Sequence, residues 1–376
     1  MNSPLVSGNT SSKYGVIGGA IVPHAPQFLS MPETEDAEQV ARVRAAMKQV
    51  GDGLRALSPD LVIVISNAHG EDFSVNCVPS FMVYCGDRAS GFGKHQGRWN
   101  LRGDVGLQLV QQLLDLGFDP AYTLDAEIGT AFTIPVEFCG YPRDFAFLPL
   151  FVNVYCPPLP KPERCFEFGK ALNRAFQLMG LRVVILASGG LSHYPATRMY
   201  PTPDLETDKG IFERLRSGNF RYLMSFDEKR LDVTGNIETR SGQILAGALG
   251  PERTPDISVL EPSWHHIYGV IGWTRPFSEL EYAPYYPAIT TKHIQLAKAV
   301  YAVVTEPGAL KAFLENPVAL KSRFDLTADE AQALAELDEN VFRERFGINP
   351  IIVYWAKLAV KGKASIRPAP APAPNQ

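Results

Sequence analysis

Residues 183–193 read VVILASGGLSH, a run of apolar residues followed by a short glycine-containing segment that ends in His193. Two other apolar runs are likewise followed by a histidine: VIGGAIV at residues 16–22 precedes His24, and LVIVI at residues 61–65 precedes His69. Short, continuous apolar runs rich in β-branched residues are typical of strands buried on both faces. Ligands of open parallel sheets bind beyond the carboxyl ends of the strands. The three histidines therefore predict a site at one edge of a sheet.

Helical patterns separate these runs. Residues 35–57 place apolar side chains at spacings of three and four, which predicts an amphipathic helix. Two further helices are expected over residues 106–116 and 167–179, each followed by a glycine (Gly117 and Gly180) that suits a helix C-terminus. The alternation of strands and helices predicts an α/β fold with a mostly parallel central sheet flanked by helices.

Composition divides the chain into five segments. We expect a flexible leader over residues 1–13, an α/β domain over 14–275, a connector rich in Pro and Tyr over 276–298, a small all-α unit over 299–360 and a disordered Pro/Ala-rich tail over 361–376. In the all-α unit, helices are predicted over 308–314, 317–324, 328–337, 339–345 and 352–358. Thr327 and Glu330 have the spacing of a capping box for the third of these helices.

The overall composition is that of an ordinary globular protein, with 376 residues, 45% hydrophobic, 20% charged and a net charge of −4. No basic stripe is present, which argues against nucleic acid as a partner. No run of about 18 apolar residues and no secretory signal are found, so we expect no membrane span and a cytoplasmic location. The five cysteines form no CxxC pair, so they predict free thiols rather than a zinc knuckle or a disulfide framework.

Glu238 lies in the segment GNIETR at residues 235–240, at the predicted start of a helix that runs to Leu249. An acidic residue there suits the helix dipole, so an ordinary helix-start glutamate is one interpretation. Combined with two strand-end histidines, Glu238 gives the two-His, one-carboxylate set of non-haem Fe(II) sites that bind substrate and dioxygen together. Zinc uses the same ligand types, so the ligand count leaves the metal open.

Each of the three strand-end histidines also has a purely structural interpretation. His24 lies in a turn between two prolines, His69 is close to Glu71 and Asp72 as ion-pair partners, and His193 is placed to pack or to cap. A single histidine is usually structural, but three at the ends of predicted strands favour a site.

The remaining histidines carry weaker signals. His95 lies in a polar, glycine-rich loop and is predicted to be on the surface, or at most in a mobile loop near the site. His265 and His266 adjoin aromatic residues and are expected either to pack or to line a pocket. His293 starts a predicted helix, and we assign no function to it.

Taken in order, these segments resemble the class III (LigB-type) extradiol ring-cleaving dioxygenases. The matching pieces are PHAP at residues 23–26, NAH at 67–69, GGLSH at 189–193, and the helix that carries Glu238 and later Gly247. Together they extend over residues 14–275. Each motif alone is modest, whereas the ordered set is specific.

The C-terminal segment has a resemblance of its own. FLENP at residues 313–317, FDLT at 324–327 and FGINP at 346–350 are similar to the small helical α subunit of protocatechuate 4,5-dioxygenase. In this chain that unit follows the α/β domain, as in gallate dioxygenases. The resemblance implies that the unit acts as a lid over the mouth of the active site, and that the protein is a homodimer.

The resemblance also implies roles for individual residues. It makes His24, His69 and Glu238 the ligands of Fe(II), and His193 the catalytic acid and base. A catechol must lose protons to bind a metal through both oxygens, and an imidazole with a pKa near neutrality can accept one. The reaction implied is cleavage of a small aromatic diol or related ring, with both atoms of O2 incorporated.

The substrate side is assigned to Thr130, Ser192, His265 and His266. Many members of the family carry an Asp-His-Gly triplet, whereas the equivalent segment here is GTAFTIP at residues 129–135, with Thr130 in place of the histidine. A threonine hydroxyl can donate a hydrogen bond but does not titrate near neutral pH. The sequence therefore leaves three substrate classes as alternatives: gallate- or protocatechuate-like diols, aminophenols and hydroxylated heterocycles.

Two other functions remain as alternatives. One is a zinc- or iron-dependent hydrolase or lyase on the same scaffold, since such a site also serves a metal-bound hydroxide. The other is a non-catalytic protein that binds a partner through its helical unit. The presence of His193 argues against this second alternative.

Overall fold

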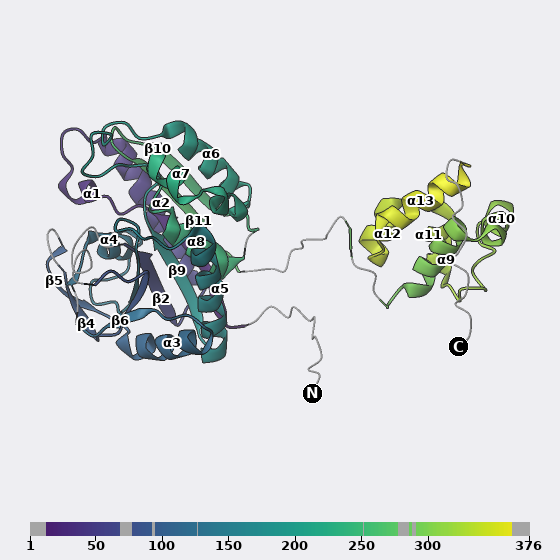
Figure 1. The fold of residues 1–376 in the computed structure, drawn as a ribbon, viewed down its shortest axis with the longest axis horizontal. Helices are drawn as coiled ribbons and strands as arrows, with labels where there is room; N and C mark the ends of the chain where they lie inside the picture. The colour runs from purple at the N-terminus through teal and green to yellow at the C-terminus, as the bar shows by residue number, and fades with distance from the viewer. Residues whose placement is uncertain are drawn as a thin grey trace. The chain divides into compact units, whose positions relative to one another are not determined.

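The computed structural model describes residues 13–67, 77–91, 95–125, 127–250, 252–276, 286–287 and 291–362. His69 lies outside these residues. The chain forms two compact units, Met1–Phe277 and Ser278–Gln376, each of which is described by itself (Figure 1).

The first unit is built on an eight-stranded sheet with the order β10-β11-β1-β9-β2-β8-β3-β6. Its centre is parallel and consists of β1 (Gly15–Val22), β9 (Arg182–Ser188), β2 (Leu61–Ser66) and β8 (Leu148–Val152). The three strands predicted from the apolar runs are therefore confirmed, and they are neighbours.

Antiparallel pairing occurs on both sides of this centre. β11 (Ile267–Trp273) runs antiparallel to β1 and to β10 (Ile257–Pro262), to which a short turn joins it. β3 (Phe81–Tyr84) is antiparallel to β8 and parallel to β6 (Ala121–Thr123). A separate small sheet contains β4 (Arg88–Gly91), β5 (Gly97–Asn100) and β7 (Glu127–Ile128).

Helices cover both faces of the large sheet, as Figure 1 shows. One face packs on α3 (Gly103–Asp115), α5 (Pro162–Met179) and α8 (Thr239–Leu249), and the other on α2 (Ala37–Ala56) and α4 (Thr130–Phe138). Successive residues of β2 alternate between the two cores, with Ile63 in the first and Val64 in the second. The α/β prediction is thus confirmed, and the double burial explains the continuous apolar runs.

The described residues of the first unit also form four further helical elements. They are α1 (Gln27–Ser30), α6 (Leu205–Arg216), the 3-10 helix η2 (Phe220–Ser225) and α7 (Glu228–Val233). Of the predicted helices, α5 begins at Pro162, five residues before the predicted start, because proline is favourable in the first turn. Gly180 ends α5 in the left-handed conformation, at φ 68°, as predicted.

The packing of α5 against α8 depends on two glycines. A Cβ atom at Gly169 would lie 1.9 Å from the Ile244 carbonyl oxygen, and one at Gly247 would lie 1.9 Å from that of Phe166. The two helix backbones therefore approach more closely than side chains would permit. This contact fixes the position of α8, whose N-terminal end carries Glu238.

The second unit contains α9 (Ile294–Thr305), α10 (Pro307–Glu315), α11 (Ala328–Glu336), α12 (Glu339–Phe346) and α13 (Pro350–Val360) around a core of its own. The capping box of Thr327 and Glu330 is confirmed. The helix predicted over residues 317–324 is wrong, because the Asn316 side chain accepts from the Val318 amide and the segment forms turns. The helix α9 begins directly after His293, where a helix start was predicted, and this start lies inside the segment assigned to the connector.

Within the described ranges, no helix combines the length and the apolar character that crossing a membrane requires. All five cysteines are free, and Cys85, Cys139 and Cys165 are buried, as the absence of paired spacings predicted.

Candidate functional site

Four segments meet beyond the carboxyl ends of the parallel strands. His24 follows β1, Tyr155 follows β8, the loop of residues 189–193 follows β9, and Glu238 stands at the start of α8. His24 Nε2 lies 3.6 Å from Glu238 Oε1, and His193 Nε2 lies 3.5 Å from the same oxygen. The structure therefore brings together three of the four residues predicted for the metal and its acid–base partner.

His24 is oriented by a chain of two hydrogen bonds. Its Nδ1 lies 2.9 Å from Ser188 Oγ, and that hydroxyl donates to the Ala131 carbonyl oxygen at 2.6 Å. Because the Ser188 hydrogen goes to Ala131, Nδ1 of His24 is the donor in the first bond. In neutral His24 the lone pair is then on Nε2, and it faces the Glu238 carboxylate. Two electron-rich atoms held at this distance favour a cation between them.

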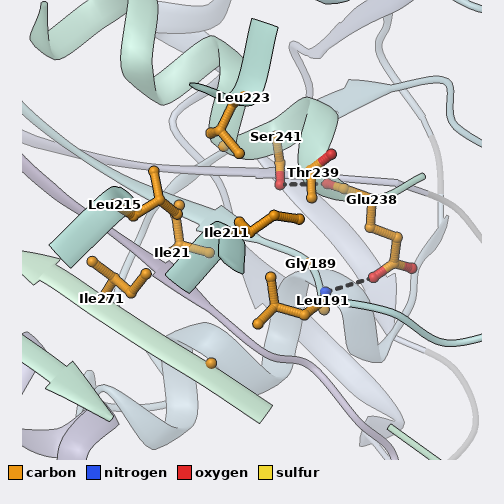
Figure 2. Close-up of a pocket in the computed structure, with 13 residues that line it drawn as sticks. Ile21, Gly189, Leu191, Ile211, Leu215, Leu223, Glu238, Thr239, Ser241 and Ile271 are labelled. Atoms are coloured by element: carbon orange, nitrogen blue, oxygen red, sulfur yellow. Dashed lines mark hydrogen bonds between the residues drawn. The ribbon is translucent and has the colours of Figure 1, made fainter. Parts of the chain in front are cut away.

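Glu238 is almost fully buried, at 1% exposure, and its carboxylate is held on both oxygens. Tyr155 donates to Oε1 at 2.8 Å, and the Gly190 amide donates to Oε2 at 2.7 Å. Figure 2 shows the carboxylate turned toward the loop that follows β9. The side chain makes no capping hydrogen bond to α8. Its orientation thus fits the site better than the ordinary helix-start role.

His193 is buried and has contacts on both ring nitrogens. Nδ1 lies 3.3 Å from the Leu191 carbonyl oxygen, and Nε2 lies 3.3 Å from the Tyr155 hydroxyl. Burial, the largest single influence, lowers the pKa of His193, but the Glu238 carboxylate together with the Leu191 carbonyl group and Asp208 raises the pKa overall. The ring is also stacked on His266, with centroids 4.3 Å apart and planes at 2°.

His266 lies against a glycine of the loop. A Cβ atom at Gly190 would lie 1.8 Å from His266 Nε2, so glycine leaves the space in which the imidazole sits. This Nε2 is buried and has no hydrogen-bond partner within the described part of the chain. Burial first, and His193 second, lower the pKa of His266 well below its ordinary value, so the ring is neutral.

His265 belongs to a second cluster of polar side chains, next to the cluster around Glu238. Its Nε2 lies 2.7 Å from Glu35 Oε1, while Glu35 Oε2 accepts from Tyr268 and Ser263, each at 3.2 Å. Tyr200 stacks on the His265 ring at 5.1 Å between centroids. Burial lowers the pKa of His265 despite its carboxylate partner. Both histidines are thus packed next to the site, and their assignment to the substrate stays a prediction.

Ser192 is oriented away from His193 by hydrogen bonds to α6. Its hydroxyl donates to Asp208 Oδ2 at 2.6 Å and accepts from the Asp204 amide at 2.7 Å, while its own amide donates to Asp208. Both hydrogen-bonding roles of the hydroxyl are thus used within the protein. Burial raises the pKa of Asp208 to about 7.

Thr130 is the first residue of α4 and is partly exposed. The next residue, Ala131, holds Ser188 and through it His24, so this end of α4 is connected to the site.

The surface prediction for His95 is wrong. The residue is buried at 6% exposure, its Nδ1 contacts Thr133, and its Nε2 lies 2.8 Å from Glu137. Polar neighbours in the sequence suggested exposure, but these side-chain partners come from α4.

Tyr155, Asp208 and Glu35 were missed from the sequence. Tyr155 had a usable signal, since it follows LPLFV at residues 148–152, another buried strand that ends at the same edge of the sheet. Asp208 and Glu35 had none, because their partners are contributed by distant segments.

The residues present are compatible with a metal ion. Zinc-type ligand distances of about 2.0–2.2 Å allow two donors of one ion to be up to roughly 4 Å apart, and His24 and Glu238 satisfy this limit. Among the residues that the structure describes, no group of three or more His, Cys, Asp or Glu is arranged to hold a metal. The third predicted ligand, His69, lies outside them.

Comparisons with known proteins are consistent with this geometry. Residues 18–271 match the family model described as the catalytic LigB subunit of aromatic ring-opening dioxygenase. This match covers more than half of the chain, and the chain therefore belongs to the LigB family.

Two relatives illustrate the similarity. A Pseudomonas putida protein named 2,3-dihydroxyphenylpropionate/2,3-dihydroxicinnamic acid 1,2-dioxygenase 2 is 32% identical over 188 residues, which are 49% of this chain and 57% of that protein. A protein from Klebsiella pneumoniae subsp. pneumoniae, with the same name but without the final numeral, is 30% identical over 256 residues, or 66% of this chain and 75% of that protein. The first match thus spans less than two thirds of the relative's length.

A solved structure of an uncharacterized protein from Escherichia coli K12 is also similar. It has 15% sequence identity and a TM-score of 0.47, and the alignment covers 68% of this chain and 99% of that one. This likeness is too weak to add to the assignment.

Proposed function

We propose that this protein is an Fe(II)-dependent extradiol dioxygenase that cleaves a small aromatic diol or related ring and inserts both atoms of O2. The observation that carries the proposal is the convergence of His24 Nε2 and His193 Nε2 on one buried oxygen of Glu238, at 3.6 and 3.5 Å, in a LigB-family chain. A ferrous ion held by His24, His69 and Glu238 would supply a centre at which the ring and dioxygen bind side by side.

The protein's own part in the reaction is orientation and proton transfer. With its Nδ1 hydrogen directed at the Leu191 carbonyl oxygen, His193 exchanges the catalytic proton through Nε2. This nitrogen donates to the Tyr155 oxygen while the ring is protonated, and it accepts from a substrate hydroxyl once that proton has left. Tyr155 contacts both this nitrogen and Glu238 Oε1, so it fixes the acid–base group relative to the carboxylate. The stacked His266 ring packs against one face of the His193 ring and, being neutral, adds no charge.

The substrate side is proposed to include Thr130, His265 and His266. The buried and unpartnered Nε2 of His266 and Nδ1 of His265, within the described residues, are suited to a hydroxyl or amino substituent that supplies the missing hydrogen bond. The Ser192 hydroxyl already donates one hydrogen bond and accepts another within the protein, so for this residue we propose a role in orienting the loop of residues 189–193. The candidate rings are gallate- and protocatechuate-like diols, aminophenols and hydroxylated heterocycles.

The test is oxygen uptake by anaerobically iron-loaded protein, with these rings added one at a time. We expect uptake with at least one ring and a ring-opened product. Absence of uptake with every ring, together with tight zinc retention, would instead favour the metal-dependent hydrolase or lyase.

Variants test the assigned roles. His193→Ala should keep iron bound while turnover falls by about 10²–10⁴-fold, the usual contribution of a general acid or base. Glu238→Gln should weaken iron binding itself. His293→Ala, in the second unit, is a matched control that should change neither property. Loss of iron in His193→Ala would show that ligand and base have been interchanged.

We further propose that the helical unit acts as a lid and that the protein is a cytoplasmic homodimer. Each unit has a core of its own, so deletion of residues 278–376 is expected to leave the first unit folded. The deletion should weaken binding of the ring more than binding of iron. Unchanged affinity for the ring would exclude the lid, and sedimentation of the full chain tests the dimer.

A further inference from the structure

A small cavity lies behind Glu238, between α8, α6, β1, β11 and the loop that follows β9. The volume of the cavity is about 20 Å³, and roughly 10–15 Å³ suffices for one water-sized molecule. Its walls are mainly aliphatic: Ile21, Leu191, Ile211, Leu215, Leu223 and Ile271. Figure 2 shows these side chains gathered on one side, with the Glu238 carboxylate at the other.

The side-chain hydroxyls of the lining are already engaged within the protein. The Ser241 hydroxyl donates to the Glu238 carbonyl oxygen at 3.0 Å, and the Thr239 hydroxyl donates to the Asn236 carbonyl oxygen at 2.7 Å. The Glu238 carboxylate accepts from the Gly190 amide at 2.7 Å. A buried water needs two to four polar partners, whereas apolar cavities stay dry and accept apolar molecules such as xenon. The occupant favoured by this lining is therefore a small apolar molecule.

We propose that this cavity binds dioxygen close to the site that consumes it. Dioxygen is uncharged and apolar, and one molecule is of the size that the cavity accepts. The inference rests on the proposed dioxygenase function for its biological meaning. The binding of an apolar gas does not depend on that function and can be measured in protein without metal.

Gly242 offers a mild way to fill the cavity. A Cβ atom there would lie 3.1 Å from Ile21 Cδ1 and 3.6 Å from Leu223 Cδ1, which are ends of flexible side chains. Gly242→Ala therefore places a methyl group in the cavity with small adjustments, and alanine also favours the helix. Gly210→Ala in α6 is the matched control, since the atom nearest to its Cβ is Tyr222 Oη at 4.0 Å.

The first measurement is xenon binding to the metal-free full chain, detected by ¹²⁹Xe NMR. We expect specific xenon binding in the wild type and in Gly210→Ala, and its loss in Gly242→Ala. Equal xenon binding in the wild type and Gly242→Ala would overturn the assignment of the cavity.

The second measurement is the KM for O2 in the iron-loaded enzyme. Gly242→Ala should raise it by roughly tenfold, the low end of the effect of one methyl group in an apolar pocket. The KM for the ring and iron affinity should stay as in Gly210→Ala. An unchanged KM for O2 in an active enzyme would refute the inference alone. Absence of turnover in the wild type would instead refute the proposed function, and with it the role of the cavity in oxygen supply.

Discussion

Asp208 provides a test of the buried network that holds the loop of His193. Its carboxylate accepts from the Ser192 amide on both oxygens, at 3.1 and 3.0 Å, and from the Ser192 hydroxyl at 2.6 Å. Burial raises its pKa from the ordinary 3.8 to about 7. The perturbation is Asp208→Asn, which keeps the shape and one acceptor oxygen but removes the charge.

The sign and size of the effect follow from the pKa. Below about pH 4, Asp208 is protonated in both the folded and the unfolded chain. Between about pH 4 and 7 only the folded protein holds this proton, so the contribution of Asp208 to the free energy of unfolding falls as the pH rises. A pKa difference of about 3 corresponds to roughly 4 kcal/mol, at 1.36 kcal/mol per unit.

The assay is urea unfolding of the metal-free protein at constant ionic strength from pH 4 to 8, followed by tryptophan fluorescence. The variant lacks the penalty, so its free energy of unfolding relative to the wild type should increase by roughly 4 kcal/mol across this range. Asp204→Asn is the control, because it changes the charge of the same helix by the same amount and asparagine caps a helix as well as aspartate does.

A flat difference would refute the reasoning. If the stability of Asp208→Asn relative to the wild type changes by less than about 1 kcal/mol over the range, the carboxylate is not held protonated by burial. The same slope in the Asp204 variant would assign the effect to the net charge instead.

Three other predictions concern single contacts. Gly190→Ala should destabilise the protein by about 1–3 kcal/mol because its Cβ would occupy the position of His266 Nε2, and unchanged urea unfolding would contradict this contact. Tyr155→Phe should cost about 1.5–3 kcal/mol in the metal-free protein, since the buried Glu238 loses a donor; an unfolding midpoint equal to that of the wild type would exclude the bond. In calorimetry of the full chain, Thr327→Ala should destabilise the second unit by about 0.5–2 kcal/mol and leave the transition of the first unit in place; a shift of the first transition would contradict the assignment of the cap to the second unit.

The parts of the fold that could be predicted are those with strong local signals. The runs at residues 16–22, 61–65 and 183–187 are apolar throughout because helices cover both faces of the sheet, and their strand assignment was confirmed. Gly180 and the capping box at Thr327 were likewise legible, because backbone conformation and end hydrogen bonds depend on neighbouring residues. The antiparallel flanks of the sheet could not be derived, since strand direction depends on connections rather than on strand composition.

The candidate site divides in the same way. His24 and His193 were predicted because each follows a recognisable strand, and Glu238 because it starts a recognisable helix. Tyr155 was overlooked although it too follows a buried strand. His95 was misplaced because burial of a loop residue depends on what packs over it.

The sequence by itself determined the strands, their order of appearance and the residue types at their carboxyl ends, because hydrophobic periodicity and chain polarity are local properties. Only the tertiary structure decided that two imidazoles face one carboxylate oxygen, that Asp208 holds the loop of Ser192, and that an aliphatic cavity lies behind Glu238. These features depend on distances between segments that are far apart in the chain. Such distances are set by close packing, for which Gly169, Gly190 and Gly247 leave the necessary space.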